Sequence, residues 1–318
     1  MNILVTGGAG FIGSHTVDAA LAAGHSVHVL DDLSTGTAAN LPDGAELLTG
    51  DVTDLAAVEQ ALTGCDAVIH LAALVSVPQS LQEPARTYHV NTTGTVGLLE
   101  AARQAGVRRA VLASTCAVYG DLPGRKDEAS PVQPQVPYAA SKCMAEQWLQ
   151  LYAVAYGMET VVLRYFNVYG PRMDVHGLYT EVLVRWMERI ADGKPPLIFG
   201  DGQQTMDFVC VPDIARANVL AAQSDIVEGT YNIASGTETS LLELAQALLR
   251  VMGSDLGVEH GPERAVNGVV RRLADTSAAK RDLGFESTIG VDEGLRQLVQ
   301  WWEPLREEIA AGRAVSAR

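Results

Sequence analysis

The sequence contains no run of 18 consecutive apolar residues and therefore no candidate for a membrane-spanning helix. Basic residues are also few, since 23 Lys and Arg stand against 38 Asp and Glu, a formal net charge of −15. An acidic surface repels phosphate backbones, so the composition argues against a nucleic-acid partner. Residues 3–6 begin a strand-like run with no basic leader before it, and we therefore expect a cytoplasmic protein without a membrane partner.

Cysteine is scarce, and its spacing matches no metal site. The four thiols, Cys65, Cys116, Cys143 and Cys210, are far apart in the chain, so we expect free cysteines in a reducing compartment and no bound metal. The chain has no internal repeat and no low-complexity segment. Its 318 residues suit one large domain or two coupled domains.

Short apolar runs alternate with helical patterns in the first part of the chain. We predict strands at residues 3–6, 26–30, 67–71 and 110–113 and helices at residues 14–23 and 92–105. Strands that alternate with helices indicate a parallel sheet covered on both faces. Further along, we predict a strand at residues 160–168 and amphipathic helices at residues 179–191, 241–252 and 291–311.

A glycine-rich turn follows the first predicted strand. Gly7, Gly10 and Gly13 have the spacing that allows a tight turn and lets the backbone approach a pyrophosphate. Phe11 and Ile12, within the same motif, are also expected to contact the cofactor, whose pyrophosphate would sit at the positive end of the following helix. Because a strand precedes the motif and a helix follows it, the sequence predicts a dinucleotide site.

Acidic residues follow the second and third predicted strands. Asp31 lies eighteen residues after Gly13, where a carboxylate binds a ribose diol and repels a 2′-phosphate, so the cofactor is predicted to be NAD rather than NADP. The alternative is that Asp31 and Asp32 form a turn-capping pair, but beside the glycine motif we favour ribose binding. Asp51 and Val52 are predicted to border the adenine.

Tyr138 and Lys142 are one turn apart on a predicted helix, and so lie on the same face. A nearby ammonium stabilises a phenolate and lowers the pKa of the phenol. The pair therefore suits a general base that removes a proton from an alcohol.

A series of motifs extends these patterns along nearly the whole chain. They are "GGAGFIGSH", "HLAA" at residues 70–73, Asn91, "STCAVYG", "PYAASK", "LRYFNVYGPR", "IFGDGQQTMDFVCVPDIARAN" and "LADTSAAKRDLGF". In this order the chain resembles the extended short-chain dehydrogenase/reductase family, specifically its NAD-dependent nucleotide-sugar epimerases and dehydratases.

The resemblance implies an α/β fold, with a Rossmann-like doubly wound parallel sheet and a smaller C-terminal substrate-binding α/β domain. The two domains would interleave in sequence. Residues 1–166 and about 207–235 would bind NAD, and about 167–206 and 236–318 would bind the nucleotide sugar. It also implies a homodimer formed through helices.

The resemblance assigns roles residue by residue. Thr115 would hydrogen-bond the sugar O4, Tyr138 would act as the base, and Lys142 would bind the nicotinamide ribose. Further contacts to NAD are expected from Leu71, Ala72, Ala73 and Asn91. At the substrate, Asn167 would lie near the diphosphate and Phe199 near the uracil, although core packing explains Phe199 nearly as well.

Family members share oxidation at C4 and diverge afterwards. An epimerase returns the hydride to the other face of the transient 4-keto sugar, whereas 4,6-dehydratases carry Thr-Asp-Glu at the strand end and use both carboxyl groups. Here that position reads Thr115-Cys116-Ala117. A thiol with an ordinary pKa of about 8.5 replaces a carboxyl group poorly, so we favour a 4-epimerase of a UDP-hexose or UDP-uronate, with Cys116 as a small wall beside the sugar.

Two alternatives remain open. In a 4,6- or 5,6-dehydratase, Cys116 would be a catalytic acid and His176 or Glu181 the base. In a catalytically silent NAD-binding module, the intact residues Thr115, Tyr138 and Lys142 would have no use.

Departures from the family pattern concern the substrate. Met206 stands where many members have a diphosphate-binding Arg, and Arg264 matches a second phosphate-binding Arg. Arg272 falls where epimerases have the residue that controls room at the sugar, which argues against N-acetyl sugars and allows pairing with a uronic carboxylate. Either Arg271 or Arg272 could simply be a solvated surface residue, but this explanation is less credible for both together.

Overall fold

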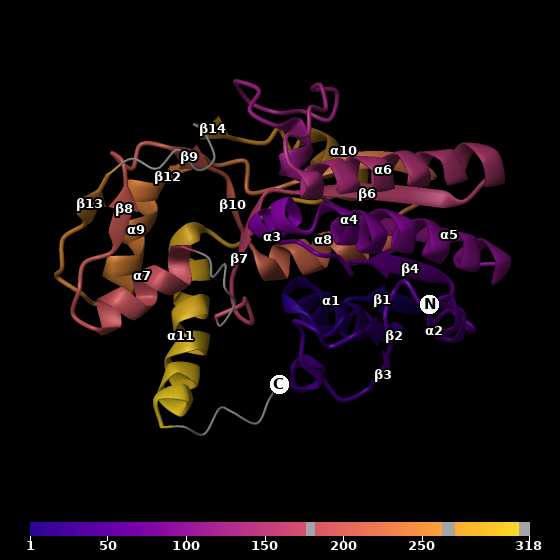
Figure 1. Ribbon diagram of the computed structural model, residues 1–318, viewed down its shortest axis with the longest axis horizontal. Coiled ribbons are helices and arrows are strands. Elements are labelled where there is room, and N and C mark those ends of the chain that lie inside the picture. Colours follow the sequence, from indigo (N-terminus) through magenta and orange to yellow (C-terminus); the bar gives the residue numbers. More distant parts are fainter. Residues whose placement is uncertain (176–181, 263–270, 312–318) are drawn as a thin grey trace.

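A seven-stranded parallel sheet forms the centre of the molecule (Figure 1). The computed structural model describes residues 1–175, 182–262 and 271–311. The sheet has the strand order β11-β6-β5-β4-β1-β2-β3, and all its pairs are parallel. The strands are β1 (Asn2–Thr6), β2 (Ser26–Asp31), β3 (Ala45–Thr49), β4 (Ala67–His70), β5 (Arg109–Thr115), β6 (Glu159–Tyr165) and β11 (Glu228–Ile233). The predicted doubly wound sheet is confirmed.

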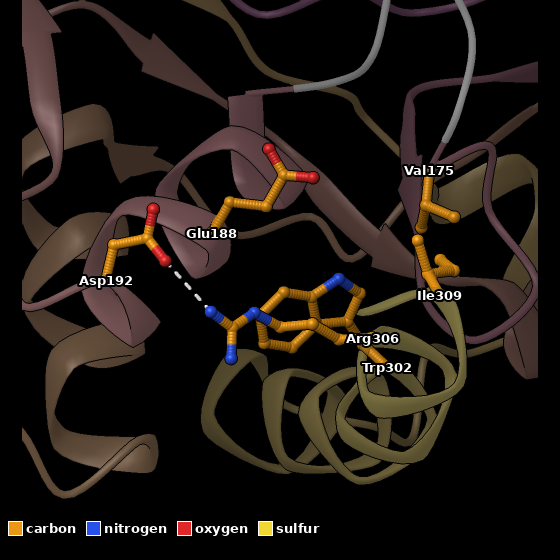
Figure 2. Close-up of a pocket in the computed structure, with 6 residues that line it drawn as sticks. All are labelled: Val175, Glu188, Asp192, Trp302, Arg306 and Ile309. Carbon is orange, nitrogen blue, oxygen red and sulfur yellow. Dashed lines mark hydrogen bonds and ion pairs between the residues drawn. The ribbon is translucent and has the colours of Figure 1, made fainter. Parts of the chain in front are cut away.

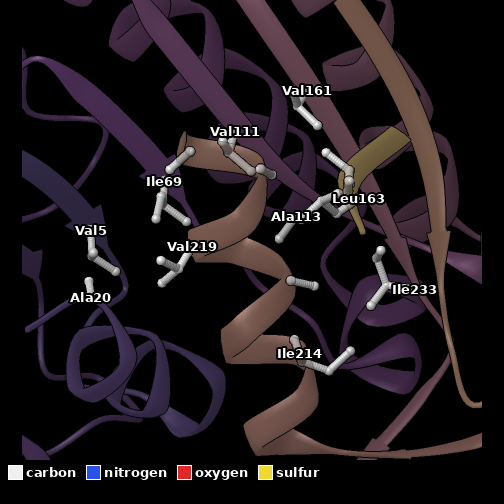
Figure 3. Packing of buried hydrophobic residues seen from close by; sticks show 14 of the residues in the cluster. Val5, Ala20, Ile69, Val111, Ala113, Val161, Leu163, Ile214, Val219 and Ile233 are labelled. Carbon is white, nitrogen blue, oxygen red and sulfur yellow. The ribbon is translucent and has the colours of Figure 1, made fainter. Parts of the chain in front are cut away.

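Helices cover both faces of this sheet, as the uninterrupted apolar strands predict. One face carries α2 (Leu55–Ala61), α5 (Gly94–Gln104) and α6 (Pro137–Tyr156), and the other carries α1 (Phe11–Ala22), α8 (Val211–Gln223) and α10 (Ser277–Leu283). Figure 3 shows Ile214 and Val219 of α8 against Ile69, Val111 and Leu163 on three neighbouring strands. These side chains are almost fully buried, so the apolar area removed from water holds helix and sheet together.

Short helical segments connect the strands near the site. They are η1 (Ala38–Asn40), α3 (Val77–Gln82), α4 (Pro84–Tyr88), the π-helical η2 (His89–Thr93) and the 3-10 segment η3 (Cys116–Tyr119). A π-helical turn is rare and often lies at a functional site. Here η2 begins the helix predicted at residues 92–105 three residues early and places Asn91 against α6.

A second group of elements lies beside the sheet, on the left in Figure 1. Its helices are α7 (Val182–Ala191), α9 (Leu241–Val251) and α11 (Val291–Ala310). Its strands are β7 (Asn167–Tyr169), β8 (Leu197–Phe199), β9 (Thr205–Met206), β10 (Phe208–Cys210), β12 (Thr239–Ser240), β13 (Glu259–Gly261) and β14 (Arg271–Arg272). The group has its own core, in which Trp186, Leu248 and Leu298 are buried.

The strand predicted at residues 160–168 is wrong as a single element. β6 ends at Tyr165, and β7 leaves the sheet to pair with β10. The peptide N–H of Phe166 still donates to Ile233 of β11, whereas that of Asn167 donates to Asp207. Apolar and aromatic residues recur on both sides of the break, so the sequence pattern does not reveal the change of partner.

No helix within the described residues is long and apolar enough to cross a membrane. The order of the sheet reverses between β1 and β4, because β2 and β3 follow on one side of β1 while β4, β5 and β6 follow on the other. In sheets of this kind, ligands bind outside the carboxyl ends of the strands at the point of reversal.

Candidate active site

The glycine turn at the end of β1 has no room for side chains. Gly7 has a φ of +70°, and a Cβ on Gly13 would lie 1.9 Å from the Gly7 carbonyl oxygen. Gly10 is the N-cap residue of α1 and offers no side-chain cap. The first N–H groups of the helix, at Phe11 and Ile12, therefore lack an intrahelical partner and remain available to a phosphate.

Asp31 and Asp32 have different surroundings. The carboxylate of Asp31 is 7% exposed and accepts backbone N–H groups from Ala9 (2.9 Å) and Leu33 (2.8 Å), which ties β2 to the glycine turn. Burial raises its pKa, and the two backbone bonds oppose that shift. Asp32 is exposed and accepts the N–H and hydroxyl of Ser34. Both carboxylates therefore cap the turn after β2, and that of Asp31 also bonds Ala9 of the glycine turn.

The ends of β3 and β4 flank the same edge. Asp51 is exposed and accepts the N–H and hydroxyl of Thr53, whereas Val52 is 5% exposed and lies in the core on the α2 and α5 side of the sheet. Leu71 and Ala72 both donate their N–H groups to the Thr6 hydroxyl. This contact brings the segment that ends at Ala73 against the glycine turn.

His70 at the end of β4 connects β1 and α5 through its two ring nitrogens. Its Nδ1 lies 2.7 Å from the Thr6 hydroxyl, and its Nε2 lies 2.9 Å from the Thr95 hydroxyl. Burial, and secondarily the positive charge of Lys142, lowers the pKa of His70 to about 3. The imidazole is therefore neutral at physiological pH and serves as a fixed hydrogen-bonding group.

Asn91 connects the β4 segment to α6. Its side chain bonds both the N–H and the carbonyl of Leu74, and its amide donates to the Ser141 hydroxyl at 3.0 Å. Ser141 in turn donates to the carbonyl oxygen of Tyr138. The amide of Asn91 is thus engaged by the protein itself, and it holds the turn of α6 that carries Tyr138.

Thr115, Cys116 and Tyr138 come together at the end of β5. The Thr115 side chain hydrogen-bonds the half-buried phenol of Tyr138 and also accepts the N–H of Ala117. Burial raises the pKa of Tyr138 to about 12, the Thr115 bond opposes the shift, and the neighbouring Cys116 adds to it. The lowered phenol pKa expected from the sequence is therefore wrong for the chain alone, because desolvation outweighs the stabilising contacts.

Lys142 is 3% exposed and has no hydrogen-bond or ion-pair partner within the described parts of the chain. Burial lowers its pKa to about 8, and the negative charge of Glu146, one turn further along α6, opposes that shift. An ammonium group that has lost its water and gained no acceptor favours a ligand with hydroxyl or oxyanion groups.

A buried ion pair lies behind this turn of α6. Glu146 accepts two bonds from the Arg164 guanidinium, at 3.0 and 2.7 Å, and one from the Ser114 hydroxyl. No role for Ser141, Glu146 or His70 was predicted from the sequence. The spacing of Ser141 and Glu146 gave a signal, because a polar residue one turn from Tyr138 or Lys142 on a buried helix face must bond within the core. His70 ends a strand and had no such signal.

The predicted substrate residues are more dispersed. Asn167 donates its side-chain amide to the carbonyl of Asp207, and Phe199 is half-buried at the end of β8. Met206 on β9 is directly opposite Arg272 on β14. Arg264, His176 and Glu181 lie outside the described residues.

A pocket of about 270 Å³ opens between α7 and α11 in the second group. Figure 2 shows Trp302 and Arg306 of α11 facing Glu188 of α7 and Asp192, which directly follows α7. Arg306 and Asp192 form an ion pair of 2.9 Å. No residue predicted for catalysis or for NAD lines it. The chemistry predicted from the sequence therefore belongs to the carboxyl edge of the sheet.

The strand reversal between β1 and β4, with the glycine turn and Asp31 at its edge, places this chain among the dinucleotide-binding enzymes of the doubly wound α/β class. A sequence model of the NAD dependent epimerase/dehydratase family matches residues 3–234. The chain belongs to this family, and NAD is its cofactor.

Individual relatives match almost end to end. The UDP-glucose 4-epimerase of Mycolicibacterium smegmatis is 38% identical over 315 residues, covering 95% of this chain and 98% of the relative. The dTDP-glucose 4,6-dehydratase of Streptomyces niveus is 36% identical over 328 residues, with 96% of each chain covered. The crystal structure of Thermotoga maritima UDP-glucose 4-epimerase with UDP-glucose superimposes with a TM-score of 0.90 at 37% identity, covering 96% of this chain and 100% of that one.

Proposed function

We propose that this protein catalyses NAD-dependent 4-epimerisation of a nucleotide sugar, a UDP-hexose or UDP-uronate, through a transient 4-keto sugar. The carrying observation is the contact between the Thr115 side chain and the Tyr138 phenol at the end of β5, with no carboxyl group at position 116 or 117. UDP-glucose 4-epimerases among the relatives support the same reaction.

The edge of the sheet suits NAD. The glycine turn and the uncapped start of α1 offer backbone N–H groups for the pyrophosphate, Asp31 offers a carboxylate for a ribose, and Lys142 offers a buried ammonium. Leu71, Ala72 and Ala73 would border the same site, together with Val52. When bound, NAD supplies a positively charged hydride acceptor that is regenerated in each cycle.

The side chains of the protein manage the proton. With NAD bound, the positive charges of Lys142 and of the cofactor would favour the phenolate form of Tyr138. The phenolate would accept the proton of the sugar 4-hydroxyl while Thr115 holds that oxygen, and Tyr138 would return the proton after the 4-keto sugar has presented its other face. Thr115 is half-buried at a strand end, so its hydroxyl is held rigidly. The ammonium group of Lys142 keeps a positive charge near Tyr138 and Thr115, which together form the proton relay.

Family membership alone does not separate epimerase from dehydratase, because the Streptomyces niveus relative is a dehydratase at comparable identity. The state of Cys116 favours the epimerase. Its thiol is 8% exposed, and burial raises its pKa, so it stays protonated and releases its proton reluctantly. A buried neutral thiol next to an alanine makes a small wall rather than an acid–base pair.

The product distinguishes the two reactions. Incubated with UDP-glucose, UDP-glucuronate, UDP-N-acetylglucosamine and dTDP-glucose, the protein is expected to yield a C4 diastereomer of unchanged mass, read by NMR and mass spectrometry. Cys116→Ser is expected to keep most of this activity, because the serine preserves size and polarity. Loss of one water from the product would refute epimerisation, and a decrease of about 10²-fold or more in Cys116→Ser would make Cys116 an acid.

The nucleotide end of the substrate is assigned to the second group of elements. We propose Asn167 for the diphosphate and Phe199 for the base. The chain leaves the sheet at Phe166 and returns to it with α8, which supports grouping residues 1–166 with about 207–235. Within the remainder, α10 departs from the proposed division, because it packs against the sheet. All four cysteines are free, as suits a protein of the reducing cytoplasm.

We also propose that two copies pair through α6. Met144, Trp148 and Leu151 recur at helical spacing, are 41%, 37% and 48% exposed, and form an apolar stripe opposite the buried face. Such a contiguous stripe on a long helix is typical of a helix-to-helix interface between identical chains.

Trp148→Glu is expected to convert the dimer to a monomer, because a charge at the centre of an apolar interface loses its water without gaining a partner. Sedimentation velocity measures the mass in solution. The matched control is Val227→Glu, which places the same charge on an exposed apolar residue between α8 and β11 and should leave the mass unchanged. A wild-type monomer at micromolar concentration would contradict the proposal.

A further inference from the structure

The two arginines of β14 face opposite ways. Arg271 is exposed and forms a two-pronged ion pair with Glu238, both bonds being 2.6 Å. Successive residues of a strand point to opposite faces, so Arg272 points away from Glu238. Arg272 is half-buried and has no hydrogen-bond or ion-pair partner in the part of the chain that the structure describes.

The Arg272 side chain lies toward the end of β5, where Thr115 and Cys116 are. Ala274, two residues beyond Arg272 in the chain, packs in one buried cluster with Cys116. Arg272 is close enough for its positive charge to act on the Cys116 thiol. Cys116 directly follows Thr115 and adjoins Tyr138, so Arg272 borders the position of the reacting sugar carbon.

Within the described residues, no neighbouring carboxylate pairs with Arg272. Asp207 is fully buried nearby, but its two oxygens accept the Ser235 N–H and hydroxyl, the Gly236 N–H and the Ala274 N–H. Met206, the register partner of Arg272 on β9, is apolar. A half-buried guanidinium with five donors and no acceptor is a receptor for an oxyanion.

We propose that Arg272 binds an oxyanion of the nucleotide sugar beside the reacting carbon, and that this oxyanion is a carboxylate on the sugar. The preferred substrate is then a nucleotide-linked uronate rather than a neutral hexose. The diphosphate is the other source of the same chemistry, but the position next to Cys116 and Tyr138 favours a group on the sugar ring. This inference rests on the proposed function.

The test compares binding of UDP-glucuronate, UDP-glucose and UDP to the NAD-loaded protein by calorimetry. Arg272→Gln is expected to lower the affinity for UDP-glucuronate about 10- to 100-fold, the usual loss for a charged hydrogen-bonded pair. Its affinities for UDP-glucose and UDP should change less than about 3-fold. Arg272→Lys keeps the positive charge but loses the two-pronged donor geometry of the guanidinium, so its affinity for UDP-glucuronate should be intermediate. The matched control, Arg271→Gln, should change none of the three.

Equal weakening of all three ligands would assign Arg272 to the diphosphate and overturn the uronate preference. Unchanged binding of all three in a variant with the wild-type melting temperature would overturn the whole inference, and Arg272→Lys supplies the comparison if Arg272→Gln is unstable. Ligand binding can be measured without turnover, so the proposal for Arg272 and the proposed epimerase function can be refuted independently. A wild-type protein that epimerises nothing, yet loses UDP-glucuronate selectively in Arg272→Gln, would refute only the proposed function.

Discussion

Tyr138→Phe is expected to lower turnover by about 10³- to 10⁴-fold, at the upper end of what a positioned general base contributes. The variant keeps the aromatic ring and loses only the hydroxyl that shares a hydrogen bond with Thr115. Affinity for NAD should change little, because the glycine turn, Asp31 and Lys142 remain in place. Product NMR gives the turnover, and calorimetry gives the NAD affinity.

The matched control is Tyr165→Phe. Tyr165 is a buried tyrosine at the end of the neighbouring strand β6, and its hydroxyl donates to Asn218 rather than facing Thr115. Removing that hydroxyl should destabilise the fold by about 1–3 kcal/mol, because Asn218 loses a partner, and should leave turnover within about 10-fold. Equal turnover losses in both variants would remove Tyr138 from the proton relay.

Lys142→Met is expected to abolish turnover while stabilising the protein. Burial lowers the pKa of Lys142 to about 8, and the ordinary value is 10.5, so below pH 8 the folded state holds a charge that water would solvate better. A pKa shift of this size lowers the free energy of unfolding by about 3 kcal/mol at pH 7. We expect Lys142→Met to raise the free energy of unfolding by about 1–3 kcal/mol at that pH. Urea unfolding without NAD measures the difference.

The pH dependence has a definite sign. Between pH 8 and about 10.5 the unfolded chain holds the proton of Lys142 more than the folded chain does, so this lysine makes stability rise with pH in that window. The difference in free energy of unfolding between Lys142→Met and the wild type should therefore be largest at pH 7 and decrease toward pH 10.

Lys126 supplies the contrasting control. It is equally buried, but its ammonium donates to the carbonyls of Leu122, Pro123 and Gly124. Lys126→Met should therefore destabilise the protein, since three partly buried carbonyl groups lose their donor. A Lys142→Met protein less stable than wild type at pH 7 would mean that the ammonium has an acceptor and is not held ready for a ligand.

Local chemistry made part of the fold predictable. The glycine turn followed from a spacing that only residues without a Cβ allow, and the structure leaves no space for one at Gly13. Strands β1, β2, β4 and β5 followed from short apolar runs between helical patterns. Tyr138 and Lys142 lie on one helix as expected, because spacing within a helix depends on no other part of the chain.

The sequence by itself determined these local elements, the doubly wound sheet and the family. Contacts between distant segments were decided only by the tertiary structure. Asp31 bonds Ala9 of the glycine turn as well as its own turn, whereas Asp32 bonds Ser34 in its own turn. Arg271 pairs with Glu238, while Arg272 has no such partner among the described residues. In each pair the two neighbours are chemically identical, so no local pattern separates them. The face that each side chain takes, and hence its burial and partners, is fixed by the strands and turns packed against it.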